Sequence, residues 1–119
     1  MNFATAEEIF RDIERGSTND AVAVSLKRNL LEAAVRYARL RTEWALADGW
    51  KDAEPDTRGE KDATRRAAHN ALIDCCNSLS RYLSEAGRDV SWRAKLTTDR
   101  REIGDFACYL HCFLGLLGA

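Results

Sequence analysis

The most informative stretch of the chain is the segment 20–47, which carries apolar residues along two sides of one predicted helix. At about 100° per residue, one apolar line runs through Leu30 and Tyr37 and a second runs through Leu31 and Val35. The complete lines are Val22, Leu26, Leu30, Ala33, Tyr37, Leu40 and Trp44, and Val24, Leu31, Val35, Ala38, Thr42 and Ala45. An ordinary surface helix has one apolar stripe, so two stripes predict a helix that is packed on two sides.

A polar strip separates these two lines. Its members are Ser25, Asn29, Glu32, Arg36, Arg39 and Glu43. Glu32 and Arg36 are four residues apart, as are Arg39 and Glu43, and this spacing allows salt bridges within a helix. The alternative interpretation is that the strip is partly shielded and faces a ligand.

Two further patterns predict helices before and after the long one. The segment 6–15 has Ile9 and Ile13 on one face, and Thr5 with Glu8 forms a capping box at its start. The segment 59–86 has a comparable box, formed by Thr57 and Glu60. Its core stripe is Ala68, Leu72, Cys75, Leu79, Leu83 and Ala86. Gly87 follows as the expected C-terminal stop.

The last part of the chain predicts one helical turn and then a fourth long helix. Ser91 is placed to cap a turn at 92–96, in which Trp92 and Leu96 point inward. A helix at 99–117 has one dense apolar face, and its opposite face consists of small groups: Gly104, Cys108, Cys112 and Gly115. Glycine within a helix costs about 1 kcal/mol against alanine, so we expect a neighbouring helix to approach closely there.

Helical patterns of this length with short connections predict an all-α fold in a single domain, 1–119. The expected architecture is an antiparallel bundle of about four long helices with a short extra turn before the last helix. The clearest connection is the loop 49–56, which ends near the single proline of the chain, Pro55. Few prolines and seven glycines favour helices over a β fold.

Composition narrows the function classes. Apolar residues make up 45% of the chain and charged residues 31%, and no apolar run approaches the ~20 residues that span a bilayer. We therefore expect a cytoplasmic protein without a signal peptide or a membrane partner. The formal net charge of −1 argues against a nucleic-acid surface. A basic cluster beside Trp92, formed by Arg93, Lys95, Arg100 and Arg101, keeps that option open as a third choice.

Candidate chemistry is sparse. A zinc site can be drawn from Cys108, His111, Cys112, Cys76 and His69, but free cysteines are usually small buried hydrophobes, so we predict no metal and no cofactor. Neither histidine has a glutamate three residues before it, and no phosphate-binding loop or nucleophile elbow is present. Enzymatic activity therefore stays an open question. Candidate ligand-binding residues are Glu32, Arg36, Arg39, His69, Asn70, Asp74, Arg93 and Asp105.

One resemblance comes from the later part of the chain. The phrase His69-Asn70-Ala71-Leu72-Ile73-Asp74, then Trp92-Arg93, then the segment 99–107, DRREIGDFA, resembles a family of small bacterial helical proteins of unknown function. The likeness covers about the last two-thirds of the chain. It implies a bacterial or phage-related origin and a helical fold, and no activity or functional residue, because that family has none assigned.

Two function classes follow from these observations. The first is a homodimeric interaction or regulatory module, because two apolar lines on one helix and a small-residue face on another offer more packing surface than a small bundle consumes. We expect the long helix or the last helix at its two-fold interface. In a variant of this hypothesis, the protein binds an unidentified protein partner. The alternative is a small-ligand protein or enzyme that binds a nucleotide or a metal on the polar helix faces.

Overall fold

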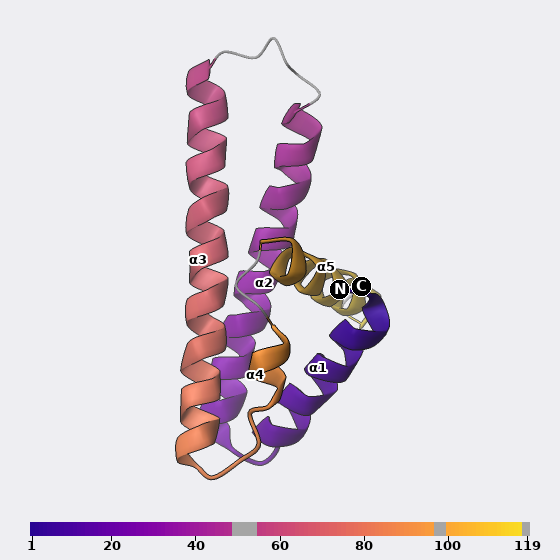
Figure 1. Cartoon of the computed structure of the whole chain (residues 1–119), viewed down its shortest axis with the longest axis vertical. Coiled ribbons are helices and arrows are strands. Elements are labelled where there is room, and N and C mark those ends of the chain that lie inside the picture. The colour runs from indigo at the N-terminus through magenta and orange to yellow at the C-terminus, as the bar shows by residue number, and fades with distance from the viewer. Residues whose placement is uncertain (49–54, 97–99, 118–119) are drawn as a thin grey trace.

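The computed structural model of the chain is all-α, as predicted (Figure 1). It describes the backbone of residues 1–48, 55–96 and 100–117, and the side chains of residues 1–43, 63–96 and 101–113. The elements are α1 (Phe3–Ser17), α2 (Ala21–Asp48), α3 (Pro55–Glu85), α4 (Trp92–Lys95) and α5 (Arg100–Leu117). The expected four long helices, with one short turn before the last of them, are confirmed.

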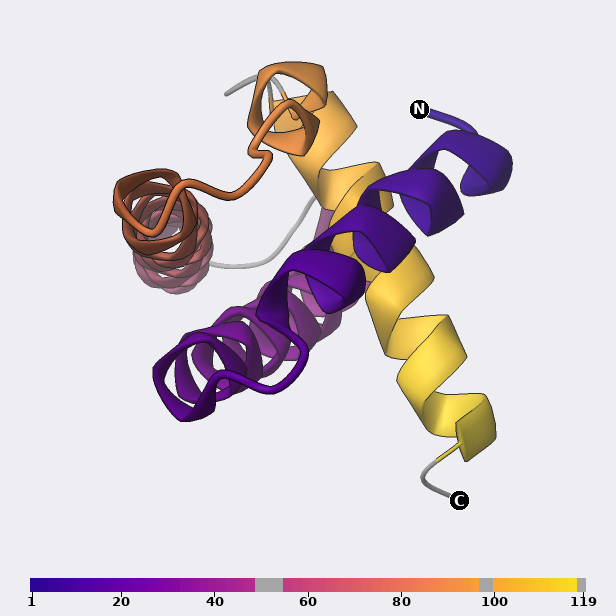
Figure 2. The same cartoon turned by 90° about the horizontal axis from the view of Figure 1, so that it is seen from below.

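The helices α2 and α3 form an antiparallel pair along the longest dimension of a molecule that measures 52 × 27 × 23 Å (Figure 1). The other long helices, α1 and α5, lie across this pair and cross one another (Figure 2). Contacts join α2 to α3 on one side and to α5 and α1 on the other. The long helix is therefore packed on two sides, as its two apolar lines indicate.

The core is formed where these helices meet and where α4 closes the lower part of the fold (Figure 1). Its largest fully buried side chains are Trp92, Tyr37, Phe106, Ile9, Ile13, Leu30, Leu72, Leu79, Leu83, Leu96, Ile103 and Leu110. The inward orientation predicted for Trp92 and Leu96 is confirmed. On α3 the core stripe is rotated slightly from the predicted one, because Cys76 is fully buried while Cys75 is half-buried and Ala86 is exposed.

The two apolar lines of α2 are the edges of one broad buried arc. Ala23 and Ala34 belong to neither line, and both lie fully buried in the middle of the arc. Lys27 and Arg41 share this sector, where a long aliphatic stem can cover apolar surface while the charged end reaches a carboxylate. The Nζ atom of Lys27 lies 4.0 Å from Oε2 of Glu14, and Nη1 of Arg41 lies 3.4 Å from Oδ1 of Asp105. The side chains of Trp44 and Ala45 lie outside the described residues.

The helix starts differ from the predicted capping boxes. The side chain of Asn2 accepts a hydrogen bond from the Thr5 N–H at 2.8 Å, so α1 begins at Phe3 and the predicted Thr5 box is wrong. Asparagine at the N-cap satisfies one of the free amides of the first turn. The helix α3 begins at Pro55, because proline is well suited to a first helical position. Thr57 therefore lies inside the helix, and the capping box predicted for it is also wrong. Residues 49–54 of the predicted loop lie outside the described residues.

The end of α3 agrees with the predicted glycine stop. Gly87 has a φ of 76°, its N–H donates to Ser84 O at 3.0 Å, and the Arg88 N–H donates to Leu83 O at 2.9 Å. These two bonds form a Schellman motif, which satisfies the last carbonyls of the helix. The next turn is held by Asp89, whose carboxylate accepts both the N–H and the hydroxyl of Ser91. The predicted cap by the Ser91 side chain is therefore absent.

A polar junction joins the ends of three helices. The carboxylate of Asp20 accepts the N–H groups of Val22 and Ala23 at the start of α2, and it also accepts the Tyr82 hydroxyl at 2.9 Å. The guanidinium of Arg88 reaches Asp20 at 2.9 Å and the Gly16 carbonyl of α1 at 3.0 Å. The Ala23 amide and then the Tyr82 hydroxyl hold the pKa of Asp20 below its ordinary value. We refer to these contacts as the Asp20 junction.

The close approach expected at Gly104 is present, but a side chain makes it rather than a neighbouring helix backbone. A Cβ atom added at Gly104 would lie 2.7 Å from Nη1 of Arg41. The same nitrogen lies 3.4 Å from Oδ1 of Asp105 and 3.7 Å from the sulfur of Cys108. The glycine thus makes room for a guanidinium that links α2 to α5.

Candidate functional site

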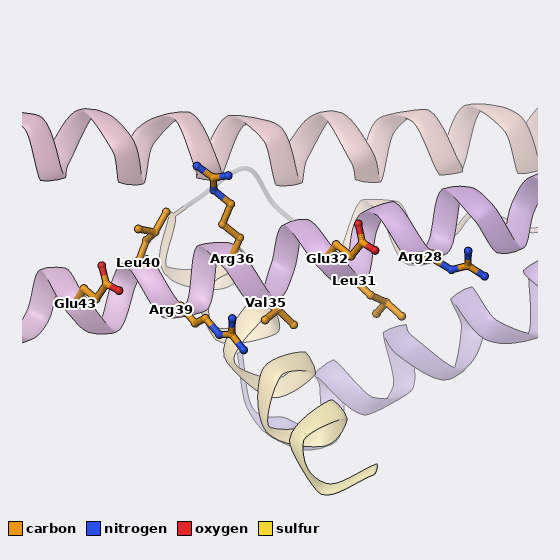
Figure 3. Close-up of a pocket in the computed structure, with 8 residues that line it drawn as sticks. All are labelled: Arg28, Leu31, Glu32, Val35, Arg36, Arg39, Leu40 and Glu43. Carbon is orange, nitrogen blue, oxygen red and sulfur yellow. The ribbon is translucent and has the colours of Figure 1, made fainter. Parts of the chain in front are cut away.

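The clearest surface feature is a hollow of about 500 Å³ along the solvent side of α2 (Figure 3). Its lining residues all come from this one helix: Arg28, Leu31, Glu32, Val35, Arg36, Arg39, Leu40 and Glu43. In Figure 3, α3 runs along one side of α2, and α1 and α5 lie on its other side. We refer to these eight residues as the α2 face.

Helix geometry explains why these residues share a face. They follow one another at alternating steps of three residues and one residue, which returns the chain to the same side of a helix at every turn. At 1.5 Å per residue the face is about 22 Å long. It is the side of α2 turned away from Ala23 and Ala34, the buried middle of the arc.

The five charged side chains of the α2 face make no ion pair within the described residues. The salt bridges predicted between Glu32 and Arg36 and between Arg39 and Glu43 are therefore absent from the structure. The Arg36 side chain extends toward α3, whereas Arg39 lies on the side of α2 that faces α5 (Figure 3). Elsewhere the same spacing does produce pairs, such as Glu7 with Arg11 at 2.6 Å. The α2 face thus presents three guanidinium groups and two carboxylates without intramolecular counterions among the described residues.

Apolar side chains border these charges. Leu31, Val35 and Leu40 are each half-buried, and Leu31 and Leu40 pack in part against the core. Leu31 and Val35 belong to the apolar line that was expected to be covered, and the packing of α5 covers this line only in part. The α2 face is therefore a mixed surface with charge along its middle and apolar groups beside it.

A second hollow of about 430 Å³ lies beside the first, between α2 and α3. Its lining residues are Asn29, Glu32, Ala33 and Arg36 from α2, and Ala67, Ala68 and Ala71 from α3. The two hollows share Glu32 and Arg36. Alanines form the α3 wall, so this wall offers apolar contact and no side-chain hydrogen bond.

The candidate residues on α3 lie apart from the α2 face. His69 is buried with its ring 5.6 Å from the ring of Tyr37, and its Nε2 atom has no hydrogen-bond partner. Its Nδ1 atom lies 3.4 Å from the Asn70 side-chain oxygen. Asn70 and Asp74 are exposed on the side of α3 that is turned away from the core.

The two remaining candidates take part in structural contacts. Arg93 donates to the Asn77 side chain at 2.9 Å and to the Leu96 carbonyl at 2.6 Å. Asp105 accepts from the Met1 amino group at 3.1 Å and pairs with Arg41. Burial opposes ionisation of Asp105, but the amino group and then Arg41 outweigh it, so the pKa of Asp105 lies below its ordinary value.

The structure therefore brings three of the eight candidates together, Glu32, Arg36 and Arg39, and leaves the other five elsewhere. Arg28 also lies on the face, although it is outside the predicted polar strip. Its spacing of four residues before Glu32 was the signal that could have identified it.

The sulfur and metal candidates do not converge on a site. Burial raises the pKa of the Cys76 thiol to about 12, while Cys112 is exposed and Cys108 half-buried. Within the described residues no group of three or more histidine, cysteine or acidic side chains could hold a metal ion. No helix in the described part of the chain has both the length and the apolar character needed to cross a bilayer.

Comparisons with known proteins give no match: no protein-family model, no curated protein and no solved structure matches the chain. This result is consistent with the resemblance to a family that has no assigned activity, and it transfers no function to the chain. The α2 face is therefore the feature of the molecule from which a function can be inferred.

Proposed function

We propose that this protein is an interaction module that self-associates through the α2 face. The observation that carries the proposal is the composition of that face: five charged side chains without ion-pair partners among the described residues, beside three half-buried apolar side chains. Contact surfaces commonly combine apolar groups with polar groups that find their partners across the interface.

The shape of the surface supports a macromolecular partner over a small ligand. A small-molecule site is a concave pocket in which a few polar groups converge on the ligand. The hollow on the α2 face is lined by about 22 Å of a single helix, so its polar groups are spread in a line and do not converge. An elongated surface of this kind suits another helix laid along it.

Sedimentation velocity over a concentration series tests the proposal. The wild-type chain should pass from 13.4 kDa monomer to dimer as its concentration rises. Measurements extend to about 1 mM, where even a complex of about −4 kcal/mol begins to form. A chain that remains monomeric over the whole range contradicts the proposal.

A matched pair of variants links the association to this face. Val35→Lys places an ammonium group at the middle of a face that already holds three guanidinium groups, and should weaken the dimer about tenfold or more, because the new charge would be buried at the contact. Val22→Lys makes the same change at a valine that is 51% exposed near the start of α2 and outside the face, and should leave association unchanged. Equal effects of both variants would locate the contact elsewhere. Circular dichroism checks that both variants keep their helices, and Arg39→Glu replaces Val35→Lys if the latter does not fold.

A small-ligand site is the second candidate, because the hollow between α2 and α3 adds a second element to Glu32 and Arg36. The nearby guanidinium groups favour an anionic ligand. A thermal-shift screen with inorganic phosphate and nucleotides tests it, with Arg36→Ala as the variant and the exposed Arg81→Ala on α3 as the control. Stabilisation that disappears in Arg36→Ala alone would support this candidate, and the lack of any shift would contradict it.

A further inference from the structure

Four of the five charged residues of the α2 face follow a self-complementary order, and the fifth, Arg36, stands next to the midpoint with its side chain extended toward α3 (Figure 3). Arg28 and Glu43 stand at equal distances on either side of the midpoint between Val35 and Arg36. Glu32 and Arg39 are also equally distant from this midpoint, and they lie nearer to it. Each of these two pairs joins a positive to a negative side chain. Leu31 and Leu40 are also equally distant from the midpoint.

Antiparallel pairing of two copies brings such positions together. In a two-fold dimer with antiparallel helices, residues at equal distances from the midpoint lie level with one another in the two copies. Arg28 then lies level with the partner's Glu43, and Glu32 lies level with the partner's Arg39. At about 100° per residue, all four charged positions fall within about 30° of the centre line of the face, so their side chains point into the contact.

The apolar positions fall on the two edges of the same face. Leu31 and Leu40 lie about 90° from its centre line, one on each side. Both are half-buried in the monomer, so a second helix laid along the face would cover what remains exposed. Charge complementarity at the centre would then set the alignment of the two copies, with the apolar groups at the edges of the contact.

We propose that the occupant of the α2 face is the same face of a second copy, in antiparallel alignment, with ion pairs between Arg28 and the partner's Glu43 and between Glu32 and the partner's Arg39. This inference rests on the proposed self-association and specifies its geometry. The two-fold axis makes each pair occur twice. A parallel two-fold dimer is disfavoured, because it sets every residue level with its own copy and therefore places like charges together.

Charge reversals in separate chains test this alignment. Glu32→Arg alone faces the partner's Arg39, and Arg39→Glu alone faces the partner's Glu32, so each variant should form a homodimer about tenfold weaker than wild type. Mixed together, the two variants should form a heterodimer close to wild-type affinity, because both contacts between them then join opposite charges. Native mass spectrometry of a mixture with one isotope-labelled variant distinguishes the heterodimer from either homodimer.

A pair of double variants provides the matched control. Glu32→Arg/Arg39→Glu and Arg28→Glu/Glu32→Arg carry the same kinds of change and the same net charge as wild type. The first keeps every proposed pair attractive, with the signs exchanged only in the pair between positions 32 and 39, and should dimerise like wild type. The second makes every pair repulsive, and should dimerise weakly at low salt, with part of the loss recovered as added salt screens the charges.

The outcomes separate this inference from the proposed function. A monomeric wild-type chain contradicts both. A wild-type dimer that the single reversals leave intact, or equal behaviour of the two double variants, keeps self-association and overturns the antiparallel pairing. Circular dichroism spectra that match wild type show that each reversal acts on association and not on folding.

Discussion

The position of Arg41 over Gly104 leads to a quantitative prediction for Gly104→Ala. Alanine in a helix interior is favoured over glycine by about 1 kcal/mol, so the change would normally stabilise α5. Here the new Cβ would lie 2.7 Å from Nη1 and 2.9 Å from Cζ of Arg41, closer than atoms can approach. The guanidinium must move away and give up its 3.4 Å contact with Asp105.

The two effects oppose one another. A partly exposed ion pair is worth about 0.2–1 kcal/mol, so Gly104→Ala in the wild-type chain should gain between about 0 and 0.8 kcal/mol. In an Arg41→Ala background the obstruction is gone, and the same change should gain about 1 kcal/mol. The expected coupling between the two positions is therefore about 0.2–1 kcal/mol, which corresponds to roughly 1–5 °C in Tm for a domain of this size.

Urea unfolding followed by circular dichroism measures this coupling in four proteins: wild type, the two single variants and the double variant. Every measurement is made at one concentration at which the chain is monomeric, because association would add to the apparent stability. Gly16→Ala serves as the control, since its Cβ would meet only Leu83, at an ordinary 3.5 Å, and its effect should not depend on Arg41. Equal gains from Gly104→Ala with and without Arg41 would refute the argument.

Two further predictions concern titratable groups. The pKa of Asp20 is held below its ordinary value of 3.8, so its carboxylate stabilises the fold above that pH, and this contribution is lost as the pH falls through the lowered pKa. The difference in unfolding free energy between wild type and Asp20→Asn should therefore be large near neutral pH and shrink below about pH 3.8. A difference that does not change with pH would show that the ionised carboxylate of Asp20 is not its source. Iodoacetamide at mildly alkaline pH should modify exposed Cys112 first, and should reach Cys76 only after denaturation, because burial raises the pKa of Cys76 to about 12. Peptide mass spectrometry reads both sites, and early labelling of Cys76 would show that its surroundings open in the native protein.

The sequence pattern predicted the helices well because apolar periodicity reports directly which side of a helix is buried. It could not show that the two lines of α2 are edges of one arc, because the middle of that arc holds small alanines and two basic residues. Lys27 and Arg41 count as polar in any pattern, yet their stems lie over the core and their charges reach Glu14 and Asp105. The direction in which α5 crosses the α2–α3 pair also depends on tertiary packing, which periodicity does not encode.

Local capping chemistry was misassigned for a related reason. Both Thr5 with Glu8 and the earlier Asn2 are acceptable starts for α1, and the chain uses the earlier one, where the Asn2 side chain accepts from the Thr5 N–H. Phe3, which this start includes in the helix, packs edge-to-face against Tyr109 of α5, with ring centroids 5.6 Å apart. The pattern of polar residues found Glu32, Arg36 and Arg39 because they share a strip on one helix. It grouped His69 and Asp105 with them only by residue type, and burial and ion pairing place these two elsewhere.

The Asp20 junction has a consequence for the order of folding. Its contacts connect positions 62 and 72 residues apart in the chain, from Asp20 to Tyr82 and from Gly16 to Arg88. Such distant partners cannot meet until the turn between the two longest helices has closed, because bringing remote segments together has an entropic cost that earlier contacts must offset. The junction should therefore form late, as the step that fastens an already collapsed hairpin to the first helix, and its loss should speed unfolding more than it slows refolding.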